Sequence, residues 1–190
     1  MAEKILTYTN LEIKGTKEIN LPLSKSIGAR HLMLSAICKR NVFSLGEHVE
    51  SLPRDLIDLV KALKDFDEGK PVINVAESGT AMRFMLTYIS VHTQSKVRLE
   101  GIGRQHERPI KPLVDALLQL GCNITYLEKT GYPPLLIEPA PITPKPIKLD
   151  ASKSSQYLSS LFLLAPLIED KAFSIEPIGE MIASRPYIDI

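Results

Sequence analysis

The chain has 190 residues, of which 44% are hydrophobic and 24% are charged, so it can bury a hydrophobic core of ordinary size. Its 23 basic and 22 acidic residues leave a formal net charge of +1, which argues against nucleic acid or an anionic membrane surface as a partner. Any site for an anion must therefore be built locally.

Several further classes of protein are disfavoured. The amino terminus has no apolar segment of a secretion signal, and the longest apolar stretch, Leu161 to Ile168, falls far short of the about 20 residues that span a bilayer. Cys38 and Cys122 lie far apart, in no metal-ligand spacing, so we expect reduced, buried thiols and a cytoplasmic protein. No metal or other cofactor is expected.

Hydrophobic periodicity predicts a mixed chain of helices and strands. In chain order, the pattern predicts a strand at Glu18–Leu21, helices at Ser26–Lys39 and Pro53–Phe66, a strand at Val72–Val75, a helix at Gly79–His92, a strand at Lys96–Glu100, a helix at Pro109–Leu120, strands at Asn123–Leu127, Leu135–Glu138 and Ile147–Asp150, a helix at Ser154–Ala165 and a strand at Ala172–Glu176. The fold class is therefore α/β, in the broad sense that includes α+β.

The predicted elements recur in a fixed order, which indicates an internal repeat. A strand is followed by a Ser/Thr/Gly-rich loop that opens an apolar helix, then by a strand and a helix opened by proline. We place the units at about residues 17–75, 76–140 and 141–190, with the proline-rich stretch Pro139–Pro146 as a surface connector. The third unit is expected to be incomplete because the chain stops at Ile190 within its second helix.

The first helix of each unit opens with groups that suit an anion, since free backbone N–H groups and the helix dipole both favour negative charge. The candidates are Lys25, Ser26 and Arg30 in the first unit, Gly79 and Arg83 in the second, and Ser154, Ser155 and Gln156 in the third. Glycine permits close approach of the backbone, and arginine presents a planar fork of donors to phosphate or carboxylate. The repeat predicts that the three openings lie on one side of the domain.

Simpler explanations exist for each candidate taken alone. Serines such as Ser24, Ser26 and Ser154 are common helix N-caps, and arginines such as Arg30 and Arg83 are usually solvated. The combination of such features, not any single one, indicates a binding site.

Six sequence blocks resemble, in order and spacing, the first half of the 5-enolpyruvylshikimate-3-phosphate synthase family. They are LPLSKSIGARHLMLSA, ESGTAMRF, GRQHERPIKPLVDALLQLG, YPPL, SSQYLSSLFLLAPL and SRPYIDI. The resemblance implies two domains, each of three βαβαββ units, that close on the substrates. It also implies transfer of the enolpyruvyl group of phosphoenolpyruvate to the 5-hydroxyl of shikimate 3-phosphate, with release of phosphate and without a metal.

The resemblance also implies roles for individual residues. Lys25 would contact both substrates; Ser26 and Arg30 would hold the shikimate moiety; Ser154, Ser155 and Ser184 would hold its 3-phosphate; Gln156 and Tyr187 would lie near the ring; and Gly79, Arg83, Arg108 and Gln156 would face phosphoenolpyruvate. The family's acid-base residues belong to the second domain, so this chain alone is expected to be inactive. That absent domain is the expected partner, and residues 1–16 are expected to form a strand segment that packs with it.

The chain departs from the family pattern around the phosphoenolpyruvate site. Glu77-Ser78 stands where Asn-Ala is usual, and Phe84 stands where proline follows the arginine. A carboxylate beside an anion site weakens anion binding, so Glu77 is expected to lower affinity there. Two other functions stay open: another enolpyruvyl transferase or cyclase-fold enzyme acting on a nucleotide substrate or an RNA end, and a non-catalytic anion-binding domain.

Overall fold

The computed structural model describes residues 23–39, 52–152, 154–168 and 172–179. Its helices and strands are, in chain order, α1 (Lys25–Ile37), α2 (Arg54–Asp67), β1 (Val72–Asn74), α3 (Gly79–His92), β2 (Val97–Glu100), the 3-10 helix η2 (Gly103–Glu107), α4 (Lys111–Gln119), β3 (Asn123–Tyr126), β4 (Leu135–Glu138), β5 (Pro146–Asp150), α5 (Ser155–Leu164), the 3-10 helix η3 (Ala165–Leu167) and β6 (Ser174–Ile178). The expected α/β class is confirmed.

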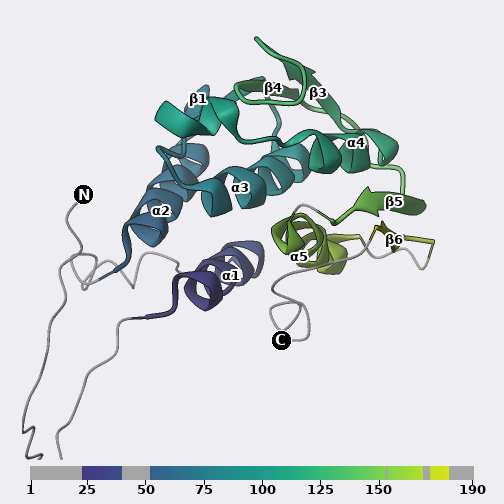
Figure 1. The fold of residues 1–190 in the computed structure, drawn as a ribbon, viewed down its shortest axis with the longest axis horizontal. Helices are drawn as coiled ribbons and strands as arrows, with labels where there is room; N and C mark the ends of the chain where they lie inside the picture. Colours follow the sequence, from purple (N-terminus) through teal and green to yellow (C-terminus); the bar gives the residue numbers. More distant parts are fainter. Residues whose placement is uncertain (1–22, 40–51, 153, 169–171, 180–190) are drawn as a thin grey trace, which may run out of the picture.

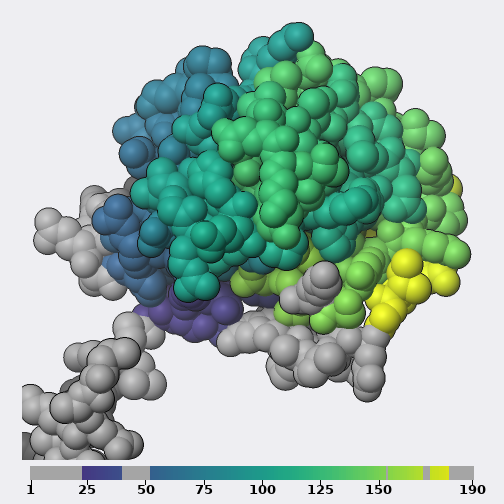
Figure 2. Space-filling view, turned by 45° about the horizontal axis from the view of Figure 1, so that its top comes forward, coloured from purple at the N-terminus to yellow at the C-terminus, as the bar shows by residue number. Residues whose placement is uncertain are grey.

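Two sheets organise these elements. The first has the strand order β1-β2-β4-β3, with β1 and β2 parallel and the other neighbours antiparallel. The chain from β1 to β4 includes α3 and α4, so its elements follow the order βαβαββ that the resemblance implies. The second sheet pairs β5 with β6 in parallel across α5. Figure 2 shows the green β3–β4 hairpin lying across the middle of one face of the molecule.

Helix α3 lies at the centre of the core. In Figure 1 it runs between α4 and the four-stranded sheet on one side and α1 and α5 on the other. Eleven of its 14 residues are buried, since its sequence is apolar on nearly every face, and such a helix is stable only when enclosed. Helix α2 differs, because it buries one leucine-rich face and exposes a charged one. The start of α3 is therefore fixed by a packed core.

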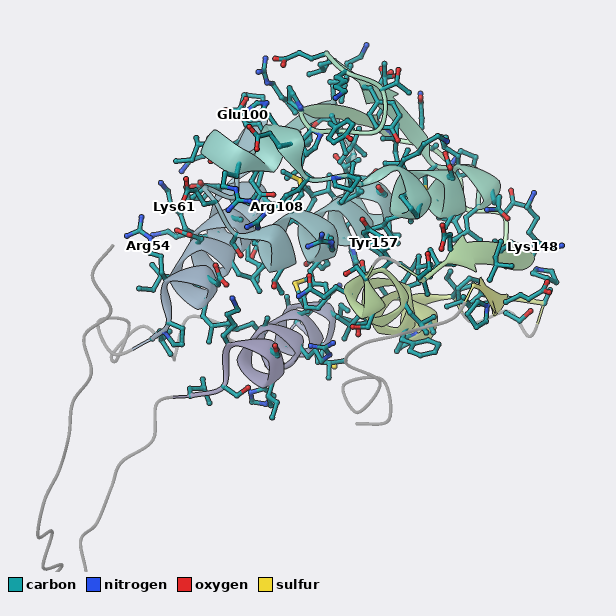
Figure 3. All side chains as sticks on the ribbon, in the orientation of Figure 1. Arg54, Lys61, Glu100, Arg108, Lys148 and Tyr157 are labelled. Atoms are coloured by element: carbon teal, nitrogen blue, oxygen red, sulfur yellow. The ribbon has the colours of Figure 1, made fainter. Side chains whose placement is uncertain are left out.

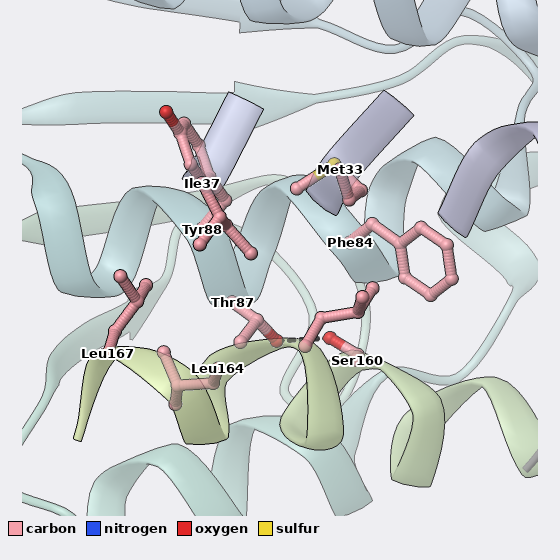
Figure 4. A pocket seen from close by; sticks show the side chains of 9 residues that line it. Met33, Ile37, Phe84, Thr87, Tyr88, Ser160, Leu164 and Leu167 are labelled. Atoms are coloured by element: carbon pink, nitrogen blue, oxygen red, sulfur yellow. Dashed lines mark hydrogen bonds between the residues drawn. The ribbon is translucent and has the colours of Figure 1, made fainter. Parts of the chain in front are cut away.

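A small apolar pocket marks the junction of α1, α3 and α5. It is lined by Met33 and Ile37 of α1, Phe84 and Tyr88 of α3, and leucines of α5 and η3, as Figure 4 shows. Within it, the hydroxyl groups of Thr87 and Ser160 are hydrogen-bonded to each other. This pair joins α3 to α5, and the Ser160 hydroxyl also donates to the carbonyl of Arg83 at 3.0 Å.

Most predicted elements are confirmed, two of them with unchanged bounds: Gly79–His92 and Leu135–Glu138. The predicted start at Pro109 is wrong by two residues, because Ile110 has a non-helical backbone conformation, with φ at −127°, and forms the N-cap of α4. The predicted strand Glu18–Leu21 lies outside the described residues. Burial is confirmed for Cys122 but wrong for Cys38, which caps the exposed end of α1.

Candidate anion site at three helix starts

One polar cavity of about 190 Å³ gathers residues from the starts of α1, α3 and α5. Its lining consists of Lys25, Asp55, Glu77, Gly79, Thr80, Arg83, Arg108 and Gln156. Lys25 comes from the first turn of α1, Gly79 and Thr80 from that of α3, and Gln156 from that of α5. The predicted convergence of three helix openings is therefore confirmed.

Each of the three helices begins with a serine cap. The hydroxyls of Ser24, Ser78 and Ser154 accept hydrogen bonds from backbone N–H groups of α1, α3 and α5. For Ser24 and Ser154, the capping explanation is thus confirmed. None of these helices has an acidic residue in its first turn, so the remaining N–H groups and the dipoles favour an anion.

Arg83 is held in the cavity by two helices. Its Nη1 donates to the Gly79 carbonyl and to Gln156 Oε1, both at 2.9 Å, and its guanidinium lies 5.2 Å from the ring centroid of Tyr157. Gln156 in turn donates through Nε2 to the Thr80 hydroxyl at 3.0 Å. Arg83 is thus a positioned group rather than a solvated arginine of a helix surface.

Gly79 is the residue over which two guanidinium groups meet. A Cβ placed there would lie 2.8 Å from Arg108 Nη1 and 2.9 Å from Arg83 Nη1. Both distances are shorter than van der Waals contact allows, so a side chain at this position would push the guanidinium groups away. Arg108 lies beside the start of α3 in Figure 3. The glycine therefore lets Arg83 and Arg108 approach one point from different elements.

Arg108 is carried by the loop that contains η2. The Glu77 carbonyl accepts hydrogen bonds from Gln105 Nε2 and, at 3.4 Å, from Arg108 Nη1. Gln105 is only 1% exposed, so its amide is a buried link between the loop and the start of α3. The loop also needs glycine at Gly103, where φ is +55° and a Cβ would lie 2.6 Å from Glu77 Oε1.

The charges in the cavity nearly balance. Lys25 Nζ forms a 2.6 Å ion pair with Asp55 Oδ2, and Glu77 adds a second carboxylate. Within the described ranges, Glu77 forms no ion pair of its own. Three cations and two carboxylates leave about one net positive charge, which favours an anionic ligand.

Comparison with known proteins agrees with this picture. A sequence profile of EPSP synthase (3-phosphoshikimate 1-carboxyvinyltransferase) matches residues 12–190. The chain belongs to the EPSP synthase family. It is 38% identical over 183 residues to the 3-phosphoshikimate 1-carboxyvinyltransferase of Bacteroides fragilis (strain ATCC 25285), a match that covers 94% of this chain and 41% of that protein.

Other members of the EPSP synthase family are similarly related. The corresponding protein of Actinobacillus pleuropneumoniae serotype 3 (strain JL03) is 37% identical over 210 residues, covering 99% of this chain and 48% of the relative. The fold resembles that of EPSP synthase from Acinetobacter baumannii, with a TM-score of 0.61 and 17% identity over 76% of this chain and 37% of that one. The chain thus spans less than half the length of its relatives.

Only some of the residues to which the EPSP synthase resemblance assigns a role line the cavity. Lys25, Gly79, Arg83, Arg108 and Gln156 line the cavity. Ser26, Ser154 and Ser155 do not line it, although they lie in or beside the first turns of α1 and α5, and Arg30, in the second turn of α1, does not line it either. Ser184 and Tyr187 lie outside the described residues.

Arg30 faces α5 from one turn further along α1. Its Nη2 donates to the Ser159 hydroxyl at 2.6 Å, its Nη1 donates to the Ser26 carbonyl at 2.8 Å, and its guanidinium lies 5.8 Å from the centre of the Phe84 ring. Phe84, which stands where the EPSP synthase pattern has proline, is buried and so belongs to the core.

Sequence reasoning missed Asp55 as a cavity residue. An acidic side chain in the first turn of an amphipathic helix is usually explained by the helix dipole, so nothing in PRDLIDL pointed to a partner in α1. The buried amide of Gln105 was also missed.

In the part of the chain that the structure describes, no helix has the length and apolar character needed to cross a membrane.

Proposed function

We propose that this chain supplies the shikimate 3-phosphate-binding half of an enzyme that transfers the enolpyruvyl group of phosphoenolpyruvate to the 5-hydroxyl of that substrate, releasing phosphate. The observation that carries the proposal is the convergence of three capped helix starts, two arginines and one lysine on a single cavity. The names of its relatives describe the same chemistry. We assign it to the amino-terminal portion of the enzyme.

The proposed roles follow the family pattern. Lys25 contacts both substrates; Ser26 and Arg30 hold the shikimate moiety; Ser154, Ser155 and Ser184 hold its 3-phosphate; Gln156 and Tyr187 lie near the ring; and Gly79, Arg83, Arg108 and Gln156 face phosphoenolpyruvate. The short bonds of Arg83 to Gly79 and Gln156 support its role, because a guanidinium already held in place loses little freedom when a phosphate binds.

The two substrates are strongly anionic, and this explains the charge of the site. Bringing them together requires several cations and oriented N–H groups, whose effect grows when closure excludes water. Proton transfer belongs to residues of a second domain of the same enzyme, which is the partner of this chain. The chain by itself therefore binds shikimate 3-phosphate weakly and turns nothing over, and the enzyme acts in the cytoplasm without a cofactor.

A phosphate-release assay tests this function. The chain extended to the length of its relatives should release phosphate from phosphoenolpyruvate only when shikimate 3-phosphate is present, and Lys25→Ala should slow that release. The 190-residue chain, purified free of full-length enzyme, should release none. Phosphate release that depends on a nucleotide sugar instead would support an enolpyruvyl transferase of the nucleotide type, and turnover by the short chain would contradict the assignment of proton transfer.

A further inference from the structure

Lys25 is already paired with a carboxylate in the cavity, that of Asp55. Its Nζ lies 2.6 Å from Asp55 Oδ2, and the two side chains are 54% and 25% exposed. Asp55 is held in the first turn of α2, where the helix dipole stabilises negative charge. Helices α1 and α2 pack against each other, so the pair joins two fixed elements.

The two arginines of the cavity are arranged differently. Arg83 donates to the Gly79 carbonyl and to the amide oxygen of Gln156, and Arg108 donates to the Glu77 carbonyl. All three acceptors are neutral. Among the residues that the structure describes, neither arginine forms an ion pair, whereas the charge of Lys25 is already compensated.

We propose that Asp55 is an internal counter-ion that an anionic ligand must displace from Lys25, and that it thereby lowers the affinity of the cavity for anions and leaves only those with further contacts tightly bound. A small anion that offers little beyond its charge gains less from Lys25 than it would from an unpaired lysine. A larger phosphate ester meets the same cost and reaches a useful affinity through contacts with its remaining atoms. Asp55 therefore weakens both anions by a similar factor, and the anion with few other contacts is left with the weaker binding.

This inference deepens the proposed function and rests on it for the identity of the natural ligand. The counter-ion itself follows from the Lys25–Asp55 geometry alone. The Asp55 carboxylate both occupies Lys25 and repels an anionic ligand, in a pair that is partly exposed to solvent. Removing it should raise the association constant for inorganic phosphate by about three- to tenfold at low salt. The gain should shrink as ionic strength rises, because exposed charges are screened.

The experiment is a calorimetric titration of the 190-residue chain and its Asp55→Asn variant with inorganic phosphate at low and at physiological salt. The control variant is Asp115→Asn, which removes the acidic partner of Lys111, an equally close 2.6 Å pair outside the cavity. Lys25→Ala shows that the measured phosphate binds at this cavity. Asp55→Ser provides a second variant, and circular dichroism confirms that each protein is folded.

We expect Asp55→Asn and Asp55→Ser to bind phosphate more tightly, with Asp115→Asn unchanged and Lys25→Ala weaker. Shikimate 3-phosphate should gain by a similar factor from the same substitutions, because it must displace the same carboxylate. Unchanged or weaker phosphate binding in both Asp55 variants would overturn the inference, as would no phosphate binding by any variant. If phosphate behaves as expected but shikimate 3-phosphate binds neither this chain nor the chain extended to the length of its relatives, the counter-ion stands and the proposed function fails. If the ester binds and the Asp55 variants leave phosphate binding unchanged, the reverse holds.

Discussion

Replacing Gly79 with alanine should damage anion binding while leaving the fold intact. The new Cβ would lie 2.8 Å from Arg108 Nη1 and 2.9 Å from Arg83 Nη1. An ordinary contact begins near 3.4 Å, so each guanidinium must retreat by at least about 0.5 Å. Both groups are ends of flexible side chains, and they can move where a packed backbone could not.

The magnitude follows from the bonds at stake. Arg83 would lose or lengthen its two 2.9 Å bonds, to Gly79 and Gln156, each worth about 1 kcal/mol net. Alanine in a helix recovers about 0.5–1 kcal/mol relative to glycine, so the free energy of unfolding should fall by no more than about 1.5 kcal/mol. A ligand that loses one charge-assisted bond loses about 1.5–3 kcal/mol, a drop in affinity of at least about tenfold.

The assay combines chemical unfolding with a shikimate 3-phosphate titration of Gly79→Ala, and Gly28→Ala serves for contrast. At Gly28 a Cβ would lie 2.6 Å from Leu56 Cδ1, between α1 and α2, so that variant should lose stability by about 1–3 kcal/mol. Undiminished affinity in Gly79→Ala would refute the role of the two guanidinium groups. So would a loss of affinity that merely follows a loss of stability.

Three further predictions concern single groups. Glu77→Asn should raise anion affinity about threefold at low salt, since it removes a like charge from the cavity lining; unchanged affinity would show that the carboxylate points away from the ligand. The Tyr157 ring lies between α4 and α5 in Figure 3, and its hydroxyl donates to the Pro109 carbonyl at 2.6 Å. Tyr157→Phe removes this bond and should lower the free energy of unfolding, measured in urea, by about 1–2 kcal/mol. An unchanged urea midpoint would contradict the contribution of the bond. Burial raises the pKa of the Cys122 thiol to about 12 from 9.0, so the folded state keeps a proton that the unfolded state loses, and stability should fall as pH rises from about 9 toward 12. Between pH 8 and 10 the loss from this thiol should be about 1.4 kcal/mol, and a Cys122→Ala variant with the same pH dependence as the parent would exclude that cause.

The sequence predicted the helices and strands well because most carry a local signal, either periodic hydrophobicity, as in α2, or a capping residue before an apolar run, as in α3. Helix α3 is apolar on nearly every face and its bounds were predicted correctly, with Ser78 capping its start. The ends that depend on distant partners were not predictable. Strand β6 runs from Ser174 to Ile178 because its register is set by β5, whereas composition alone placed it two residues earlier.

The part of the candidate site formed by the repeated helix starts was predictable from the sequence. The contacts between individual side chains of different helices were not. Lys25, Gly79 and Gln156 follow from position in the repeat. The direction of Arg30 toward Ser159 depends on how α1 packs on α5, and the pairing of Asp55 with Lys25 depends on how α1 packs on α2. Such contacts are set by tertiary packing, which no local pattern records.

A calorimetric titration with shikimate 3-phosphate tests the central claim most directly, alongside unphosphorylated shikimate, inorganic phosphate and the Lys25→Ala variant. The account predicts saturable binding of shikimate 3-phosphate that is tighter than that of either part alone and that falls when Lys25 is removed. Affinity that Lys25→Ala leaves unchanged would contradict it. So would the absence of binding both in this chain and in the chain extended to the length of its relatives.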